Sequence, residues 1–161
     1  MSDIAVTAAS QGIDWFKYIS PVASVIVSTG ITYWFFVARK KDENLSYLNK
    51  EISDILKISM AYPHCEYKEF CDSWDPVKAK DGSPEAVKYL QYNIYTTLVF
   101  NYASSLCSHF KYNEDKFLQH TDIKSWIRLH KKAWKQPLND ENENIDTYER
   151  EFIEIVNRYI G

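Results

Sequence analysis

Glycine is scarce in this sequence, with 4 residues among 161, and only Gly82 lies between Gly30 and the C-terminal Gly161. A loop that cradles phosphate needs several closely spaced glycines, and neither a P-loop nor G-x-G-x-x-G occurs. The zinc-protease motif H-E-x-x-H and the hydrolase motif G-x-S-x-G are also missing. The sequence therefore predicts no catalytic residue and no cofactor. Enzyme activity stays open, with a non-enzyme favoured.

Cysteine is also sparse, and its odd number indicates free thiols in a reducing compartment rather than a disulfide framework. Structural zinc sites need four ligands, and the spacings C-x5-C and C-x-H are unlike theirs. We also expect no nucleophilic pair of Cys107 with His109 or His130. Residues two apart on a helix do not face each other, and no third group that would orient the histidine is identified. We therefore expect no metal. The residues considered for zinc are His64, Cys65, Cys71, Cys107 and His109.

Charge is absent from Tyr18 to Ala38, a predominantly apolar run. These 21 residues would span about 31 Å as a helix, which matches the hydrocarbon core of a bilayer. Aromatic residues at both ends suit the two membrane interfaces. A buried helix of a soluble core is the alternative, but it would carry charge on one face. A cleaved signal peptide would have a shorter apolar run and a basic N-terminal flank.

Three consecutive positive charges, Arg39, Lys40 and Lys41, follow this run and act as a basic stop. By the positive-inside rule they place the rest of the chain in the cytoplasm. We therefore expect an extracytoplasmic tail (1–14), a transmembrane anchor with its basic stop (15–41) and a cytoplasmic helical domain (42–161). The expected location is the inner (cytoplasmic) membrane, crossed once.

Two features of the anchor and the domain bear on partners. Ser20, Ser24 and Ser28 recur at every fourth position, so they form a face of small residues that lets two spans approach closely. They are candidate helix-packing residues, or incidental serines. Residues 42–161 carry 15 Lys and Arg against 20 Asp and Glu, and an acidic domain is not expected to bind nucleic acid.

The domain is predicted to be all-α, a small bundle of about four helices. The first helix has apolar residues at 3,4 spacing (Leu45, Leu48, Ile52, Ile55 and Ser59) and ends near Pro63. Two heptads favour a core-facing helix over a coiled coil. A connection follows, with a short helix at 66–72 and turns at Asp75-Pro76 and Asp81-Gly82.

The central helix is expected to start at Ser83-Pro84-Glu85, because serine caps and proline fits the first turn. It runs to about Lys111. A turn over 113–120 precedes a third helix over 122–136, which Pro137 ends. The last helix follows an acidic loop, with Asp146-x-x-Glu149 as a capping box. The buried stripe predicted for the central helix consists of Val87, Leu90, Ile94, Leu98, Tyr102, Leu106 and Phe110.

Basic residues gather on one side of the third helix: Lys124, Arg128, Lys131, Lys132 and Lys135. Together with Arg39, Lys40 and Lys41 they are candidates for contact with the anionic inner leaflet. The alternative is a solvated face, or one paired with the acidic loop at 140–143, which would add little stability.

This layout resembles uncharacterised families of short bacterial single-pass membrane proteins with a cytoplasmic helical domain. The shared features are one N-terminal span, a helix ending at Tyr62-Pro63, a Pro-Glu-started central helix and a later helix with tryptophan. The resemblance implies no established activity. We expect a membrane-anchored interaction or assembly module without catalytic activity, whose partners are the lipid bilayer and either a second copy or another protein. The alternative is a membrane-acting effector or accessory subunit that oligomerises through its span.

Overall fold

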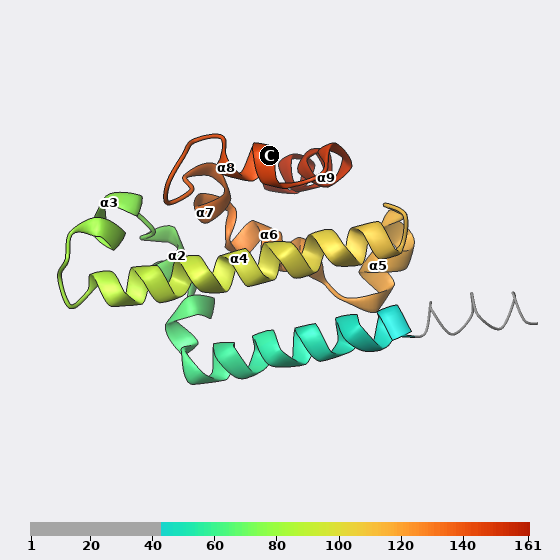
Figure 1. The fold of residues 1–161 in the computed structure, drawn as a ribbon, viewed down its shortest axis with the longest axis horizontal. Coiled ribbons are helices and arrows are strands. Elements are labelled where there is room, and N and C mark those ends of the chain that lie inside the picture. Colours follow the sequence, from blue (N-terminus) through green and yellow to red (C-terminus); the bar gives the residue numbers. More distant parts are fainter. Residues whose placement is uncertain (1–42) are drawn as a thin grey trace, which may run out of the picture. The chain divides into compact units, whose positions relative to one another are not determined.

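Two long helices, residues 43–61 and α4 (Ala86–His109), run antiparallel side by side and form the base of the domain (Figure 1). The computed structural model describes residues 43–161, and residues 44–161 form one compact unit. The described part is helical without strands, which confirms the all-α prediction for it. No helix within it is both long enough and apolar enough to cross a membrane. The predicted anchor at 15–41 lies outside the described residues.

Short helices connect these two long ones. The chain turns at Pro63 into the 3-10 helix η1 (Pro63–Glu66), then forms α2 (Lys68–Asp72) and α3 (Pro76–Lys80). Asp75 caps α3 by accepting a hydrogen bond from the Val77 backbone N–H at 2.8 Å. Gly82 has φ of +72°, a backbone conformation in which glycine carries no steric penalty, and it turns the chain towards α4.

The C-terminal half packs across α4. It comprises α5 (Glu114–His120), α6 (Ile123–Leu129), α7 (Lys131–Lys135), α8 (Glu143–Thr147) and α9 (Arg150–Ile160). Asn113 and Asp122 cap α5 and α6 through their side-chain oxygens. In Figure 1, α9 lies on the opposite side of α4 from helix 43–61.

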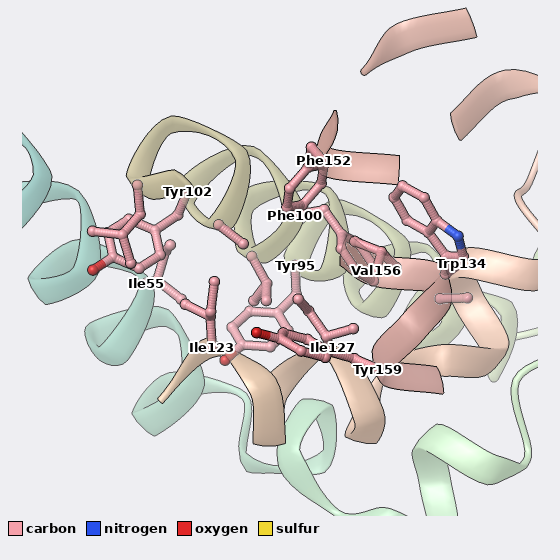
Figure 2. Close-up of a cluster of buried hydrophobic side chains, with 14 of the residues drawn as sticks. Ile55, Tyr95, Phe100, Tyr102, Ile123, Ile127, Trp134, Phe152, Val156 and Tyr159 are labelled. Carbon is pink, nitrogen blue, oxygen red and sulfur yellow. The ribbon is translucent and has the colours of Figure 1, made fainter. Parts of the chain in front are cut away.

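The core lies where α4, α6 and α9 meet (Figure 2). Ile123 and Ile127 of α6 and Phe152 and Val156 of α9 are fully buried there. Leu48 and Ile55 bury one face of helix 43–61 against the same core, so the prediction of a core-facing first helix is confirmed.

The buried stripe predicted for α4 is wrong over the N-terminal half of the helix. Val87, Leu90 and Ile94 are exposed by 54%, 40% and 63%. Tyr89, Tyr92 and Tyr95 are buried instead, at 3% exposure or less. The prediction holds further along the helix, where Tyr102 and Leu106 are fully buried. The physical reason is the hydrogen bonding of the tyrosine hydroxyls, described below.

The predicted element boundaries also need correction. The expected single helix over 122–136 divides at His130, whose φ of −97° and ψ of 16° leave the α geometry. Asp146 lies inside α8 and Glu149 is the N-cap residue of α9 without a side-chain cap, so they form no capping box. Three short helices, α3, α5 and α8, stand where turns and loops were expected.

Candidate functional site

A row of buried tyrosines fixes the rotation of α4 about its axis. Tyr89, Tyr92, Tyr95 and Tyr102 each reach a polar group on another element of the domain. The hydroxyl of Tyr89 lies 3.2 Å from Ser73 Oγ, and that of Tyr102 lies 2.9 Å from Thr121 Oγ1. Because a buried Tyr hydroxyl needs a partner, this row faces the interior and leaves the opposite side of the helix in solvent.

Tyr92 and Tyr95 belong to a polar centre with the buried His130 and the partly exposed Glu66. The Tyr92 hydroxyl lies 3.1 Å from His130 Nδ1, and Tyr95 donates a hydrogen bond to Glu66 Oε1. His130 Nε2 is 3.9 Å from the same carboxylate oxygen and has no hydrogen-bond partner among the described residues. The centre therefore ties η1, α4 and the α6–α7 junction together.

Burial sets the protonation of this centre. The His130 ring is fully buried, and desolvation of its charged form lowers its pKa to about 3. Burial raises the pKa of Glu66, while the hydrogen bond from Tyr95 opposes that shift. At neutral pH the histidine is thus uncharged and acts as a hydrogen-bond partner of Tyr92, not as a cation paired with Glu66.

The three thiols of the described residues are inert. Cys65, Cys71 and Cys107 are all fully buried and free. Burial raises their pKa values, to about 12 for Cys65 and Cys107 and to about 11 for Cys71. A nucleophilic or metal-binding cysteine requires the thiolate, which these values disfavour. Within residues 43–161, no three His, Cys, Asp or Glu side chains are grouped so that they could hold a metal.

The opposite side of α4 is a surface with the composition of an interface. Val87, Leu90 and Ile94 follow each other at 3,4 spacing, and the exposed line continues through Thr97, Asn101 and Ser108 at positions of the same heptad frame. No charged side chain occurs between Lys88 and His109. Depletion of charge marks the centre of protein–protein interfaces, and apolar 3,4 spacing marks helix-pairing seams. We call this line, from Val87 to Ser108, the uncharged face.

A hollow of about 140 Å³ borders the uncharged face on the side of α8. Thr97 and Asn101 of α4 and Asn144 and Tyr148 of the C-terminal half contribute to its lining. The Tyr148 hydroxyl donates to Asn101 Oδ1 at 2.9 Å, which holds the rim of the hollow against α4. The hollow therefore extends the uncharged face with amide and hydroxyl groups.

The basic residues predicted to contact the leaflet are largely engaged within the domain. Arg128 Nε donates to the Tyr159 carbonyl at 3.2 Å, and Lys124 Nζ lies 5.1 Å from the centroid of the Tyr159 ring. Lys135 Nζ donates to the Gly161 carbonyl at 3.4 Å. Three cations thus converge on the C-terminal end of α9, where the helix dipole is negative. None of these three contacts involves the acidic loop at 140–143, which was the alternative partner expected for the basic residues.

The remaining two basic residues of this set flank Asp72. Lys132 Nζ donates to the Asp72 carbonyl at 3.1 Å, and Lys131 is exposed. Contact with the inner leaflet stays a prediction. The candidates Ser20, Ser24, Ser28, Arg39, Lys40 and Lys41 lie outside the described residues.

Sequence reasoning missed both the polar centre and the uncharged face. Glu66 and His130 are 64 positions apart, and no spacing rule connects them. The sequence did contain a signal for the uncharged face, because α4 has apolar or aromatic residues on both sides and no charge over most of its length. Such a helix is buried all round or has one side left for a partner.

No protein-family model, no curated protein and no solved structure matches this chain.

Proposed function

We propose that this chain is a non-catalytic helical interaction module held at a membrane. Its N-terminal apolar segment is the anchor, and the uncharged face of α4 is the surface that receives the partner. The observation that carries the proposal is the exposure of Val87, Leu90 and Ile94 in one line on α4, a helix of 24 residues. An enzyme is not supported by the polar centre, whose histidine is buried and neutral.

The apolar part of the uncharged face is large enough to contribute to binding. Fully burying a Val, Leu or Ile side chain contributes about 1.5–3 kcal/mol. Val87, Leu90 and Ile94 are each about half exposed, so covering all three contributes roughly 2–5 kcal/mol before the costs of association. That supports a weak contact, which a shared membrane strengthens by raising the effective concentration.

A direct test combines cell fractionation with recovery of the partner. The full chain, extracted in mild detergent at native abundance, is expected in the membrane fraction together with a partner protein or a second copy. Recovery is expected to fall at least fivefold for Leu90→Asp/Ile94→Asp, because a charge on the uncharged face would have to be desolvated.

The matched control is Val77→Asp on α3, an apolar residue that is 72% exposed and is not part of the uncharged face. It is expected to leave recovery unchanged. Location in the soluble fraction, or equal recovery for the α4 variant and the α3 variant, would contradict the proposal.

A further inference from the structure

A hollow of about 380 Å³ lies where α2 meets α6 and α7. We infer that this hollow, called the cationic hollow below, binds the dianionic phosphoryl group of a phosphomonoester. The inference goes beyond the proposed interaction module and does not depend on it. The lining consists of three cationic side chains, one carboxylate, one hydroxyl and one leucine: Lys68, Arg128, Lys131, Asp72, Ser125 and Leu129.

The charge of the cationic hollow favours an anion. The domain as a whole carries more acid than base, whereas three positive charges and one negative charge leave this lining with a net charge of +2. The pKa of the Asp72 carboxyl is lowered by its hydrogen bond with Lys68, and also by the charges of Lys131 and Lys132. Asp122, which caps α6, is not part of the lining. Asp72 therefore compensates only part of the positive charge.

Arg128 is held in place and keeps donors for a ligand. Its Nε donates to the Tyr159 carbonyl at 3.2 Å, which positions the guanidinium without using its Nη–H groups. Neither Arg128 nor Lys131 forms a salt bridge within residues 43–161. A guanidinium binds two oxygens of a phosphoryl group at once, and a lysine ammonium binds as a point charge. The lining thus offers both kinds of phosphate-binding group.

A phosphomonoester matches this lining better than other anions do. It carries about −1.5 to −2 charges at pH 7, close to the opposite of the net charge of the hollow, whereas a carboxylate or a phosphodiester brings one negative charge. The volume lies near the lower end of small-molecule pockets, about 300–1,000 Å³, so it suits a phosphoryl group with a short carbon moiety. Leu129 and the aliphatic stems of the lysines border that moiety. An extended polyanion is disfavoured by the acid excess of the domain.

Titration of the full chain with phenyl phosphate tests this site. The chain is kept in a neutral detergent and a phosphate-free buffer near neutral pH, and phosphorus NMR of the ligand follows binding. Lys131→Glu, at an exposed position, is expected to weaken binding by about tenfold or more, because it turns an attraction into a repulsion. The matched control is Lys57→Glu, exposed on helix 43–61 and outside the hollow. It is expected to change the affinity by less than about twofold.

Two further measurements sharpen the test. Lys68→Gln removes an exposed cation from the α2 side of the hollow and is expected to weaken binding by about fivefold. It makes the result independent of any effect of Lys131→Glu on folding. Dimethyl phosphate, a monoanionic diester, is expected to bind the unsubstituted chain about tenfold more weakly than phenyl phosphate does.

The same phosphoryl group occurs on soluble phosphomonoesters and on the headgroup of phosphatidic acid. The full chain is therefore titrated again in phosphatidylcholine bilayers that contain either phosphatidic acid or phosphatidylglycerol at equal surface charge. Equal affinity for phenyl phosphate in the two bilayers supports a soluble ligand. A lower affinity in the phosphatidic acid bilayer supports the headgroup, which then competes for the cationic hollow.

Three outcomes overturn the site: no saturable binding of phenyl phosphate, equal weakening by Lys131→Glu and Lys57→Glu, or equal affinity for dimethyl phosphate. None of these outcomes bears on recovery of a partner through the uncharged face. Failure of the cationic hollow and failure of the proposed interaction module are therefore distinguishable.

Discussion

At the scale of single residues, the neutral buried His130 makes the stability of the domain sensitive to acid. Its pKa is lowered from 6.5 to about 3 in the folded state. Its contribution to stability is therefore fully present above pH 6.5 and is lost as the pH falls towards 3. The loss is at most about 1.4 kcal/mol per pH unit. Glu66 acts in the opposite direction, because its raised pKa makes protonation favour the folded state.

We predict that replacing this histidine flattens the acid limb of the stability curve. Urea unfolding of His130→Gln between pH 7 and pH 4 is expected to show a shallower decrease in the free energy of unfolding than the unsubstituted chain. The control is His109→Gln, at a partly exposed position, which is expected to keep the steeper decrease. Identical slopes for all three proteins would mean that another group sets the acid sensitivity.

A second prediction concerns the partner of that histidine. Tyr92→Phe removes the hydroxyl at 3.1 Å from His130 Nδ1 and leaves a fully buried ring without a hydrogen bond on either nitrogen. We expect a loss of about 1–3 kcal/mol in the free energy of unfolding. Tyr67→Phe, at a position that is 60% exposed, is expected to change it by less than about 0.5 kcal/mol. Equal effects would show that the Tyr92 hydroxyl has no structural role.

At the scale of elements, α4 is the helix whose rotation decides what the domain presents to its surroundings. Its tyrosine row is buried, so the Val87–Leu90–Ile94 line is left outside. We predict that Ile94→Ala changes the free energy of unfolding by less than about 0.5 kcal/mol, whereas Leu106→Ala lowers it by about 2–5 kcal/mol. Thermal or urea unfolding measures both. A large loss for Ile94→Ala in the monomer would place the buried side of α4 where the sequence pattern had put it.

The helix α4 also shows which features of the fold could be predicted from the sequence. Its existence, its start after Ser83-Pro84 and its length could be predicted, because capping residues and periodicity are local. Its rotation could not, because α4 has two uncharged sides and the choice depends on partners such as His130 and Glu66, far along the chain. Hydrophobic scales favour Val and Leu over Tyr for the interior, and here the hydrogen bonds of the tyrosine hydroxyls outweigh that preference.

The third predicted helix shows the same limit for the basic residues. Their spacing along α6 and α7 could be read from the sequence, and so could the burial of Ile123 and Ile127. Their contacts with the C-terminal end of α9 could not be predicted, because Tyr159 and Gly161 come from a segment about 30 residues later. A basic stripe on a helix can therefore stabilise the C-terminal end of a neighbouring helix, without a membrane or an acidic partner.

At the scale of the whole molecule, the apolar part of the uncharged face, from Val87 to Ile94, lies at a distance from the point where the chain enters the domain. Asn44 and Tyr47 share a hollow with Ser105 and Ser108, at the C-terminal half of α4. Leu90 is 15 residues away from Ser105 along the helix, or about 22 Å. A contact at Leu90 would therefore lie well away from the residues at which the chain enters the domain.

The orientation of the chain in the membrane is the last prediction, and the structure determines how it has to be measured. Labelling the natural cysteines would be uninformative, because Cys65, Cys71 and Cys107 are fully buried whichever side the domain occupies. Met60 is 75% exposed, so Met60→Cys provides an accessible thiol. Positive charge after the span predicts a cytoplasmic domain. We therefore expect a membrane-impermeant maleimide to label Met60→Cys after lysis and not in intact cells.

The control for this measurement is Ser10→Cys in the predicted extracytoplasmic tail, which is expected to react in intact cells. Each variant carries a single substitution, and both keep the same buried natural cysteines. The reverse pattern, with Met60→Cys labelled in intact cells and Ser10→Cys only after lysis, would place the domain outside. It would also move the uncharged face of α4 to a compartment where any partner would have to be extracytoplasmic.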